Sequence, residues 1–338
     1  MKLPMKHFLI VFSMVMITCS CEQLILDDGL VSEDPKTNFD YLWNECNRKY
    51  AYFDVKNIDW NLVYDQYAPL ISEEISNDSL FQVMRAMLVE LRDAHTNLVS
   101  TFNISFYQTD LLGQDNFDFR IIEENYLPSN YYISGPFVHD FLSGGEVGYV
   151  RFSSFSGDID NINLDFILNR YRNTKGLILD LRENGGGTPT DMFSLLSRFI
   201  DERTLIYYSR IKDGPEKNDF STPEAAYIDP HVGLRYNKPI MMLVDRGTYS
   251  AGSFTALATK ALPNITLLGD TTGGGLGAPN GGQLPNGWTY RFSISQTLTL
   301  DKDPSYENGV PPDILAYLDW SDLAKDEVLD AAISEIVD

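Results

Sequence analysis

A serine at the junction between a strand and a helix is the strongest chemical feature of this sequence. The apolar run Ile240–Val244 has the length and bulk of a buried strand, and residues 253–259 have helical character. Ser250 lies between them, where backbone N–H groups face outward at the positive end of a helix. Such groups can stabilise a developing oxyanion, so Ser250 is a candidate nucleophile. A serine at this position can also simply cap the helix, as can Ser253.

A serine nucleophile needs a neighbouring base, and the chain has four histidines. His95 follows a motif-like Asp93 at the end of a predicted helix and is the best-placed candidate, although a lone histidine is often structural. His139 and His231 lie in polar, turn-rich surroundings. No H-x-x-H or H-E-x-x-H spacing is present, so we expect no metal and no cofactor.

Alternating strands and helices must position these residues. The apolar patterns predict strands at residues 147–152, 177–181, 240–244 and 265–268, and helices at 160–172, 190–199 and after Ser250. This order predicts an α/β fold whose mostly parallel sheet is covered by helices on both faces. Ligands of such sheets bind beyond the carboxyl ends of the strands, where the Ser250 turn and the glycine turn at residues 185–187 lie.

The remaining segments are predicted to be more peripheral. Helical periodicity begins at Phe39, and further helices are expected at residues 60–67, capped by Asp59, and 80–91, with Asp78 or Ser79 at the start. We therefore predict a helical subdomain over residues 39–98 and an α/β core over 99–338. The glycine-rich residues 272–287 are expected to form a mobile loop, and residues 322–336 a closing helix. Cys46 shares a helical face with apolar residues and is interpreted as a buried residue of the hydrophobic core.

The first residues have the pattern of a bacterial lipoprotein signal. A positive start containing Lys2 and Lys6 precedes a short apolar stretch and then Thr18-Cys19-Ser20-Cys21. We predict a signal peptide over residues 1–20, a lipid on Cys21 and a polar tether over 21–38; Cys19 is the alternative lipid site. The apolar stretch is too short to span a bilayer. This reading anchors the protein in the cell envelope, facing the periplasm or the cell surface.

The amino-acid composition argues against some classes of binding partner. The 338 residues are 43% hydrophobic, enough for one large domain or one domain with a small companion. The formal net charge of -22 argues against binding nucleic acid or an anionic membrane surface. Removal of Lys2 and Lys6 with the signal would change this charge to -22 - 2 = -24. The composition leaves the oligomeric state open.

Four motifs in order resemble the tail-specific (C-terminal-processing) serine peptidase family. They are Leu91-Arg92-Asp93-Ala94-His95-Thr96, Asp180-Leu181-Arg182-Glu183-Asn184-Gly185-Gly186-Gly187, Asp245-Arg246-Gly247-Thr248-Tyr249-Ser250-Ala251 and Glu307-Asn308-Gly309-Val310-Pro311-Pro312-Asp313. The resemblance covers roughly residues 39 to 320. It implies a crotonase/ClpP-like α/β core preceded by a small helical subdomain.

The resemblance also implies roles for individual residues. One branch of the family pairs its serine with a lysine, but Gly275 stands at that position here, and Lys260 lies about three turns along the Ser250 helix. The chain looks instead like the tricorn-type branch, which implies His95 as base for Ser250 and Glu307 as the distal acid. That branch has a serine where this chain has Ala94, so the link between the acid and His95 is left open.

The same resemblance implies an oxyanion site and a class of substrate. The Ala251 N–H is expected to be one oxyanion donor and the Gly186 N–H the other, with Gly185 or Gly187 as alternatives. Only about 50 residues separate the histidine motif from the first core strand, so we expect no peptide-binding PDZ domain. The sequence predicts a cell-envelope serine endopeptidase with a peptide or protein substrate. The alternatives are a non-catalytic binding protein for a peptide or lipophilic ligand, as in the similar retinoid-binding repeats, and an inactive scaffold.

Overall fold

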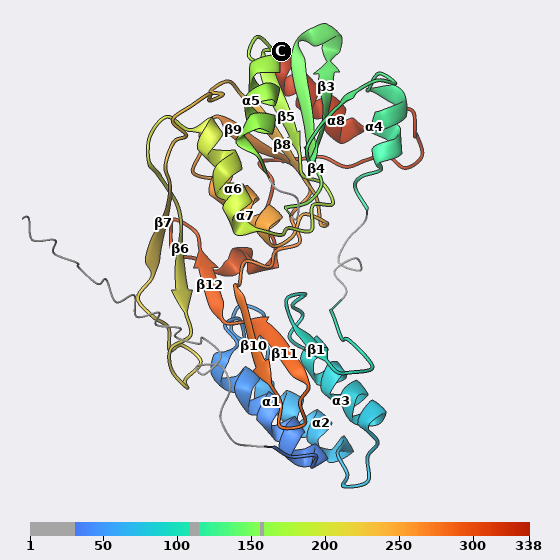
Figure 1. Cartoon of the computed structure of the whole chain (residues 1–338), viewed down its shortest axis with the longest axis vertical. Helices are drawn as coiled ribbons and strands as arrows, with labels where there is room; N and C mark the ends of the chain where they lie inside the picture. The colour runs from blue at the N-terminus through green and yellow to red at the C-terminus, as the bar shows by residue number, and fades with distance from the viewer. Residues whose placement is uncertain (1–30, 108–114, 156–158) are drawn as a thin grey trace, which may run out of the picture.

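A seven-stranded sheet forms the centre of the computed structural model, which describes residues 31–107, 115–155 and 159–338 (Figure 1). The strands from β13 to β4 are parallel, and β3 and β2 extend the sheet antiparallel, which confirms the mostly parallel α/β prediction. In spatial order they are β13 (Ile314–Leu315), β9 (Ile265–Gly269), β8 (Ile240–Val244), β5 (Gly176–Asp180), β4 (Val147–Phe152), β3 (Phe137–Leu142) and β2 (Tyr132–Ser134).

Helices cover both faces of this sheet, because alternate side chains of its strands point to opposite sides. Leu177 and Leu179 of β5 face a core that includes side chains of α5 (Asn161–Arg170), α6 (Pro189–Leu196) and α7 (Ala251–Thr259). Ile178 faces the other core, with α8 (Glu327–Val337). A further helix, α4 (Phe119–Asn125), packs into the second core. The carboxyl ends of β5 and β8 therefore emerge side by side from a rigid layer.

Two smaller sheets connect this layer with the N-terminal helices (Figure 1). One has the order β12-β6-β7 and the other β1-β11-β10. Side chains of β11 and of the loop between β10 and β11 share a hydrophobic cluster with the N-terminal helices. The elements are β1 (Asn97–Val99), β6 (Thr204–Ile211), β7 (Glu224–Ile228), β10 (Pro279–Gln283), β11 (Thr289–Ser293), β12 (Ser295–Leu298), α1 (Pro35–Lys49), α2 (Trp60–Tyr67) and α3 (Asn77–Val89).

The glycine-rich segment at residues 272–287 differs from the expected loop, because it contains strand β10. Each β10 residue pairs with a residue of β11, including the glycines Gly281 and Gly282. Backbone hydrogen bonds to a partner strand, which no local pattern reveals, hold this weak strand former in place. The packing of β11 and the loop before it against the helices brings residues from the far end of the chain into the helical region.

Capping side chains mark the start of several helices. Helix α1 starts at Pro35, before Phe39 and inside the predicted tether, because Asp34 accepts the Thr37 N–H. Helix α2 has the predicted cap, Asp59. The others start at caps that differ from the predicted ones or lie beside the predicted start: Ser76 for α3, Asp160 for α5 and Asp326 for α8.

The N-terminal predictions fall mostly outside the described residues. The signal segment at residues 1–20 and the candidate lipid sites Cys21 and Cys19 all lie there, and the subdomain boundary at residue 98 stays a prediction. Within the described part, no helix is long and apolar enough to cross a membrane. Cys46 is fully buried among apolar side chains, as predicted.

Candidate active site

Ser250 lies on a strained turn immediately before α7. Its backbone has φ 51° and ψ -122°, in a region that side-chain-bearing residues rarely occupy. The Ser250 N–H donates to the Gly274 carbonyl at 3.0 Å, which helps to hold the turn. The Ser250 side chain makes no capping hydrogen bond, and the Ser253 hydroxyl lies 3.0 Å from the Thr248 carbonyl. Neither serine therefore acts as the helix cap that the sequence left open.

His95 is held by a turn between α3 and β1. Arg92 has a left-handed φ of 49°, which reverses the chain after the helix. The Asp93 Oδ1 then accepts the His95 N–H at 2.9 Å, an arrangement that short acidic side chains favour in turns. The carbonyl of His95 accepts a hydrogen bond from Arg291 Nε at 3.2 Å, on the paired strand β11. Local and long-range contacts together determine where the imidazole points.

The structure brings these two residues into contact from opposite parts of the molecule. His95 Nε2 lies 3.0 Å from Ser250 Oγ, although 155 residues separate them. The His95 side chain is only 11% exposed. Burial lowers the pKa of His95 below its usual value, and Asp93 opposes this effect. A neutral imidazole at hydrogen-bond distance from a hydroxyl can accept its proton, which is the arrangement that a serine nucleophile requires.

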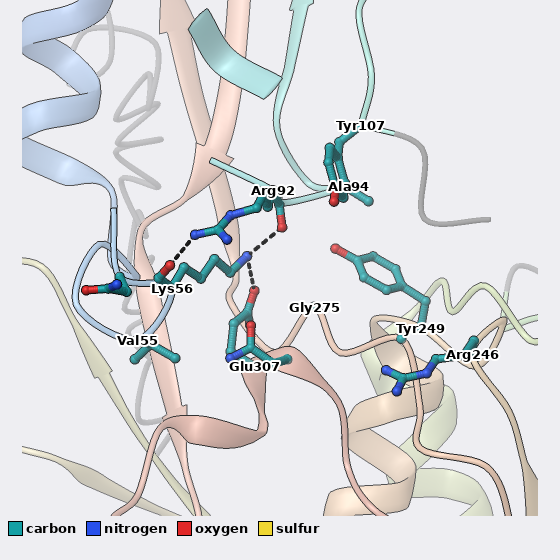
Figure 2. Close-up of a pocket in the computed structure, with 12 residues that line it drawn as sticks. Val55, Lys56, Arg92, Ala94, Tyr107, Arg246, Tyr249, Gly275 and Glu307 are labelled. Carbon is teal, nitrogen blue, oxygen red and sulfur yellow. Dashed lines mark hydrogen bonds and ion pairs between the residues drawn. The ribbon is translucent and has the colours of Figure 1, made fainter. Parts of the chain in front are cut away.

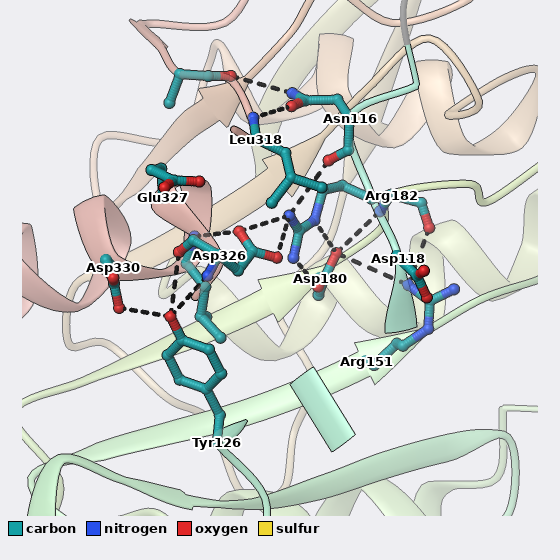
Figure 3. Close-up of polar contacts among 12 residues, drawn as sticks. Asn116, Asp118, Tyr126, Arg151, Asp180, Arg182, Leu318, Asp326, Glu327 and Asp330 are labelled. Atoms are coloured by element: carbon teal, nitrogen blue, oxygen red, sulfur yellow. Dashed lines mark hydrogen bonds and ion pairs between the residues drawn. The ribbon is translucent and has the colours of Figure 1, made fainter. Parts of the chain in front are cut away.

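The turn after β5 is supported by a buried charge network (Figure 3). The Arg182 guanidinium lies between Asp180, at 2.8 Å, and Asp326, at 2.9 Å, and all three side chains have no solvent exposure. Asp326 also caps α8 by accepting the Leu329 N–H. Arg151 extends the network by donating to the Arg182 carbonyl. The network therefore connects the end of β5, and the turn that follows it, to helix α8.

The glycine turn lies directly against the serine turn. A Cβ on Gly186 would lie 2.8 Å from the Ala251 nitrogen and 2.7 Å from the Tyr249 carbonyl oxygen, so only glycine allows this approach. Asn184 joins the two turns, because its carbonyl accepts the Tyr249 N–H at 2.9 Å. However, the Gly186 N–H donates to Asn184 Oδ1 at 2.9 Å, so the predicted oxyanion donor already has a partner.

Among the described residues, the N–H groups of Ala251 and of Gly187 make no hydrogen bond. Both lie in the two turns that the sequence assigns to oxyanion binding. The Ala251 N–H is thus available in the predicted position, and Gly187 is the alternative glycine with an uncommitted N–H.

Glu307 lies near the site but is bonded to residues other than His95. Its Oε1 lies 3.1 Å from Lys56 Nζ, and its Oε2 accepts the Leu276 N–H at 2.7 Å. Burial raises the pKa of Glu307 to about 7, against the opposing effect of Lys56. Figure 2 shows Lys56 extending between Glu307 and the Arg92 carbonyl, to which its ammonium donates at 3.0 Å. No contact between Glu307 and His95 is found among the described residues.

A cleft of about 400 Å³ opens beside these residues, between the helical region and the sheet (Figure 2). Ala94 and Tyr249, the neighbours of His95 and Ser250, line it together with Lys56, Gly275 and Glu307. The described residues contain no group of three histidine, cysteine or acidic side chains close enough to hold a metal ion. The cleft therefore lies next to the residues that precede His95 and Ser250 in the chain.

Two residues bear on the alternative lysine mechanism. Lys260 pairs with Asp313 at 2.5 Å, at the far end of α7 from Ser250. Gly275 has a φ of 74°, and the Tyr249 ring fills the space beside it.

Sequence reasoning missed the contribution of Tyr249, Lys56 and Asn184, because their roles depend on contacts between distant segments. Asp93 was visible in the histidine motif but was given no role.

The sequence of this chain matches known protein families and individual relatives. The model of peptidase family S41 matches residues 146–316, and that of the tricorn protease C1 domain matches residues 32–89. The carboxy-terminal processing protease CtpA of Bacillus subtilis is 28% identical over 195 residues, which cover 57% of this chain. The match covers only 40% of that relative's length.

The similarity to solved structures extends over more of the chain than the sequence matches do. A crystal structure of a candidate peptidase from Parabacteroides merdae superposes with a TM-score of 0.86 and 35% identity, covering 91% of this chain and 98% of the other. Mature CPAF in complex with lactacystin gives a TM-score of 0.66 at 14% identity, over 91% of this chain and 98% of that one. The second likeness concerns the fold alone.

Proposed function

The chain belongs to peptidase family S41, and we propose that it hydrolyses peptide bonds through an acyl-enzyme on Ser250. The observation that carries this proposal is the 3.0 Å contact between Ser250 Oγ and His95 Nε2. A serine hydroxyl is a weak nucleophile until a neighbouring base accepts its proton. The strained backbone at Ser250 aims the hydroxyl away from the helix end instead of into a cap.

The reaction runs in two halves. In the first, Ser250 Oγ attacks the peptide carbonyl while its proton moves to His95 Nε2. The tetrahedral intermediate then collapses, and His95 returns the proton to the leaving amine, which leaves an ester on Ser250. In the second half, His95 deprotonates a water molecule that attacks this ester and restores the free serine.

Two backbone N–H groups stabilise the oxyanion in both halves. The Ala251 N–H is one, since it projects at the N-terminus of α7 and has no partner among the described residues. The second comes from the glycine turn. The Gly187 N–H makes no hydrogen bond to a described residue and can take this role, whereas the Gly186 N–H must first leave Asn184 Oδ1. Replacing Gly187 with proline removes its N–H and, in a folded protein, should lower kcat about 10²- to 10³-fold.

A fluorophosphonate probe separates a peptidase from a binding protein on the same fold. The wild type should be labelled once, at Ser250, and should cleave a casein or peptide-library substrate. Ser250→Ala should lose both signals, while Ser253→Ala, which removes the other serine hydroxyl of this motif, should keep them. If the folded wild type is neither labelled nor able to cleave any peptide in the library, the protein is a binder or a scaffold.

We also propose that the mature protein is an envelope lipoprotein with its lipid on Cys21. The proposal is supported by the sequence of residues 1–21, since an apolar stretch followed by Ser20-Cys21 has the pattern of a lipid-modification site. Cys21→Ala should lose the lipid, as seen by mass spectrometry, and should leave the membrane fraction. Cys19→Ala is the matched control and should stay lipidated. The reverse result assigns the lipid to Cys19.

A further inference from the structure

We propose that Asp93, and not Glu307, is the residue that orients His95 and stabilises its charged form during catalysis. This inference rests on the proposed peptidase function. Asp93 is a positioning residue in this scheme, because it acts on the substrate only through His95. Asp93 Oδ1 lies 4.0 Å from His95 Nδ1, the ring nitrogen that faces away from Ser250. The same oxygen accepts the His95 N–H at 2.9 Å, which holds the carboxylate beside the ring.

Three buried polar atoms of this turn lack hydrogen-bond partners among the described residues. Asp93 Oδ2 and His95 Nδ1 are both buried and make no hydrogen bond to any described residue, and the same is true of the Thr96 hydroxyl. Leaving such atoms unpaired is energetically unfavourable. A 4.0 Å gap is too long for a direct hydrogen bond, but one water molecule can bridge it. Catalytic hydrogen bonds that are long in free enzymes also shorten in the substrate complex.

Glu307 is less suited to the same role because its carboxylate is already satisfied. One oxygen pairs with Lys56 and the other accepts the Leu276 N–H. Lys56 is itself almost fully buried, with 5% of its side chain exposed, and it also donates to the Arg92 carbonyl. The Lys56–Glu307 pair therefore supports the turn that carries His95. The Asp93 carboxylate lies closer to the imidazole: its Oδ1 accepts the His95 N–H and, at 3.4 Å, the Tyr249 hydroxyl, and its Oδ2 has no hydrogen-bond partner among the described residues.

The surrounding charges support the same assignment. Burial opposes the charged form of Asp93, yet Lys56 and His95 hold the pKa of this carboxyl below its usual value. Burial also disfavours the imidazolium, as do Arg291 and Lys56, whereas Asp93 favours it. Nearby phenols stay neutral because burial and the acidic side chains raise their pKa well above 10. The titratable groups around His95 and Asp93 are Lys56, Arg291, Glu307, Tyr249, Tyr50 and Tyr52.

The test compares Asp93→Asn with Glu307→Gln in the full-length protein. Each change replaces a carboxyl group with an amide of the same shape. Because the pKa of Glu307 is raised to about 7, Glu307→Gln removes a full negative charge only above that pH. Asp93→Asn should lower kcat about 10²-fold or more, within the roughly 10⁴-fold effect of the equivalent change in a serine-protease triad, and should change KM little. It should also move the acid limb of the kcat/KM profile to lower pH, since the imidazolium loses its only favourable charge among those found around it. A residue that only supports the fold would leave this limb in place.

The pKa of His95, which sets the acid limb of the kcat/KM profile, can also be measured directly by spectroscopy. NMR titration reports the pKa of His95 without any need for activity, and His95→Gln assigns its signal among the four histidines of the chain. The proposal holds if Asp93→Asn lowers the pKa of His95 by more than Glu307→Gln does. It is overturned if Glu307→Gln has the equal or larger effect. Because this readout is independent of turnover, an enzyme that fails the fluorophosphonate test can still pass or fail this one.

Two further measurements test the proposal if Asp93→Asn does not fold. Asp93→Ser keeps an oxygen that can accept the His95 N–H and should give the same shift as Asp93→Asn. In the wild type, nitrogen shifts of the neutral imidazole should show the proton on Nδ1, facing Asp93, with Nε2 free to accept from Ser250. A proton on Nε2 would contradict the proposal without any substitution.

Discussion

The ring of Tyr249 fills the space that a side chain on Gly275 would need. A Cβ built on Gly275 would lie 2.3 Å from Tyr249 Cζ and 2.6 Å from its hydroxyl oxygen, closer than atoms can approach. The backbone of Gly275 also has a φ of 74°, which residues other than glycine rarely adopt. Position 275 is where the lysine of the serine–lysine branch would stand. Tyr249 and the backbone of Gly275 together disfavour a lysine at this position.

This relationship predicts the cost of adding a single methyl group. Gly275→Ala should lower the free energy of unfolding by about 2–4 kcal/mol, from a left-handed backbone and a collision with the Tyr249 ring. Gly287→Ala is a matched control, since Gly287 has a φ of 87° but its nearest neighbour is 3.8 Å away. Urea unfolding measures both. Equal losses for the two variants would mean that the Tyr249 ring yields easily.

Ser250 and His95 should behave as one unit. Ser250→Ala and His95→Ala should each reduce kcat on the order of 10⁴-fold or more, and the double variant should be hardly worse than either single one. His231→Ala, outside the site, serves as the control and should retain activity. The measurements are peptide cleavage and the rate of fluorophosphonate labelling. A His95→Ala protein that acylates at the wild-type rate would assign the base to another residue.

Activity should rise with pH through the pKa of His95. The neutral imidazole is the active base, and burial lowers the pKa of His95 below its usual value of about 6.5. A lowered pKa means that the proton leaves at lower pH, so activity should persist into mildly acidic solution. The profile of kcat/KM between about pH 4 and 8 checks this. The amount of folded protein must be measured at each pH, because burial also lowers the pKa of His139, to about 4. An acid limb above pH 6.5 contradicts the prediction.

The buried charge network should be costly to break. Arg182→Met leaves Asp326 buried without its cation and Asp180 with only Arg151, at 3.9 Å, and this should cost about 3–5 kcal/mol of unfolding free energy. The matched control is Arg203→Met, because its ion pair with Asp229 has side chains that are 60% and 68% exposed and should contribute about 0–1 kcal/mol. Denaturant unfolding with an unchanged m-value provides the comparison. Similar losses in the two variants would show that Arg182 does not hold the sheet to α8.

Much of the fold could be predicted from the sequence because its signals are local. The run Ile240–Val244 is apolar at every position, as a strand buried on both faces must be, and it is strand β8. Helix α2 begins after Asp59 because that side chain meets free N–H groups two and three residues later. Ser250 and His95 were identified from short motifs, each carried by a few neighbouring residues.

Other features depended on partners distant in the chain. Strand β10 lies in a glycine-rich segment with no strand pattern, and pairing with β11 makes it a strand. Asn184 was known as part of a motif, but its bonds to Gly186 and Tyr249 depend on two turns meeting at the edge of the sheet. The predicted donor Gly186 was therefore assigned without knowledge of its partner.

The sequence by itself determined which residues can do the chemistry, and the tertiary structure decided how they are supported. A hydroxyl and an imidazole are visible as residue types, whereas the 4.0 Å separation of Asp93 and His95 and the pairing of Lys56 with Glu307 are not. Two acids, Asp93 and Glu307, were both available in the motifs as partners for the base. The position of Lys56, which comes from a distant loop, supports the choice of Asp93 that we propose. The strength of a charge interaction depends on distance and on the exclusion of water, and both arise only when the chain has folded.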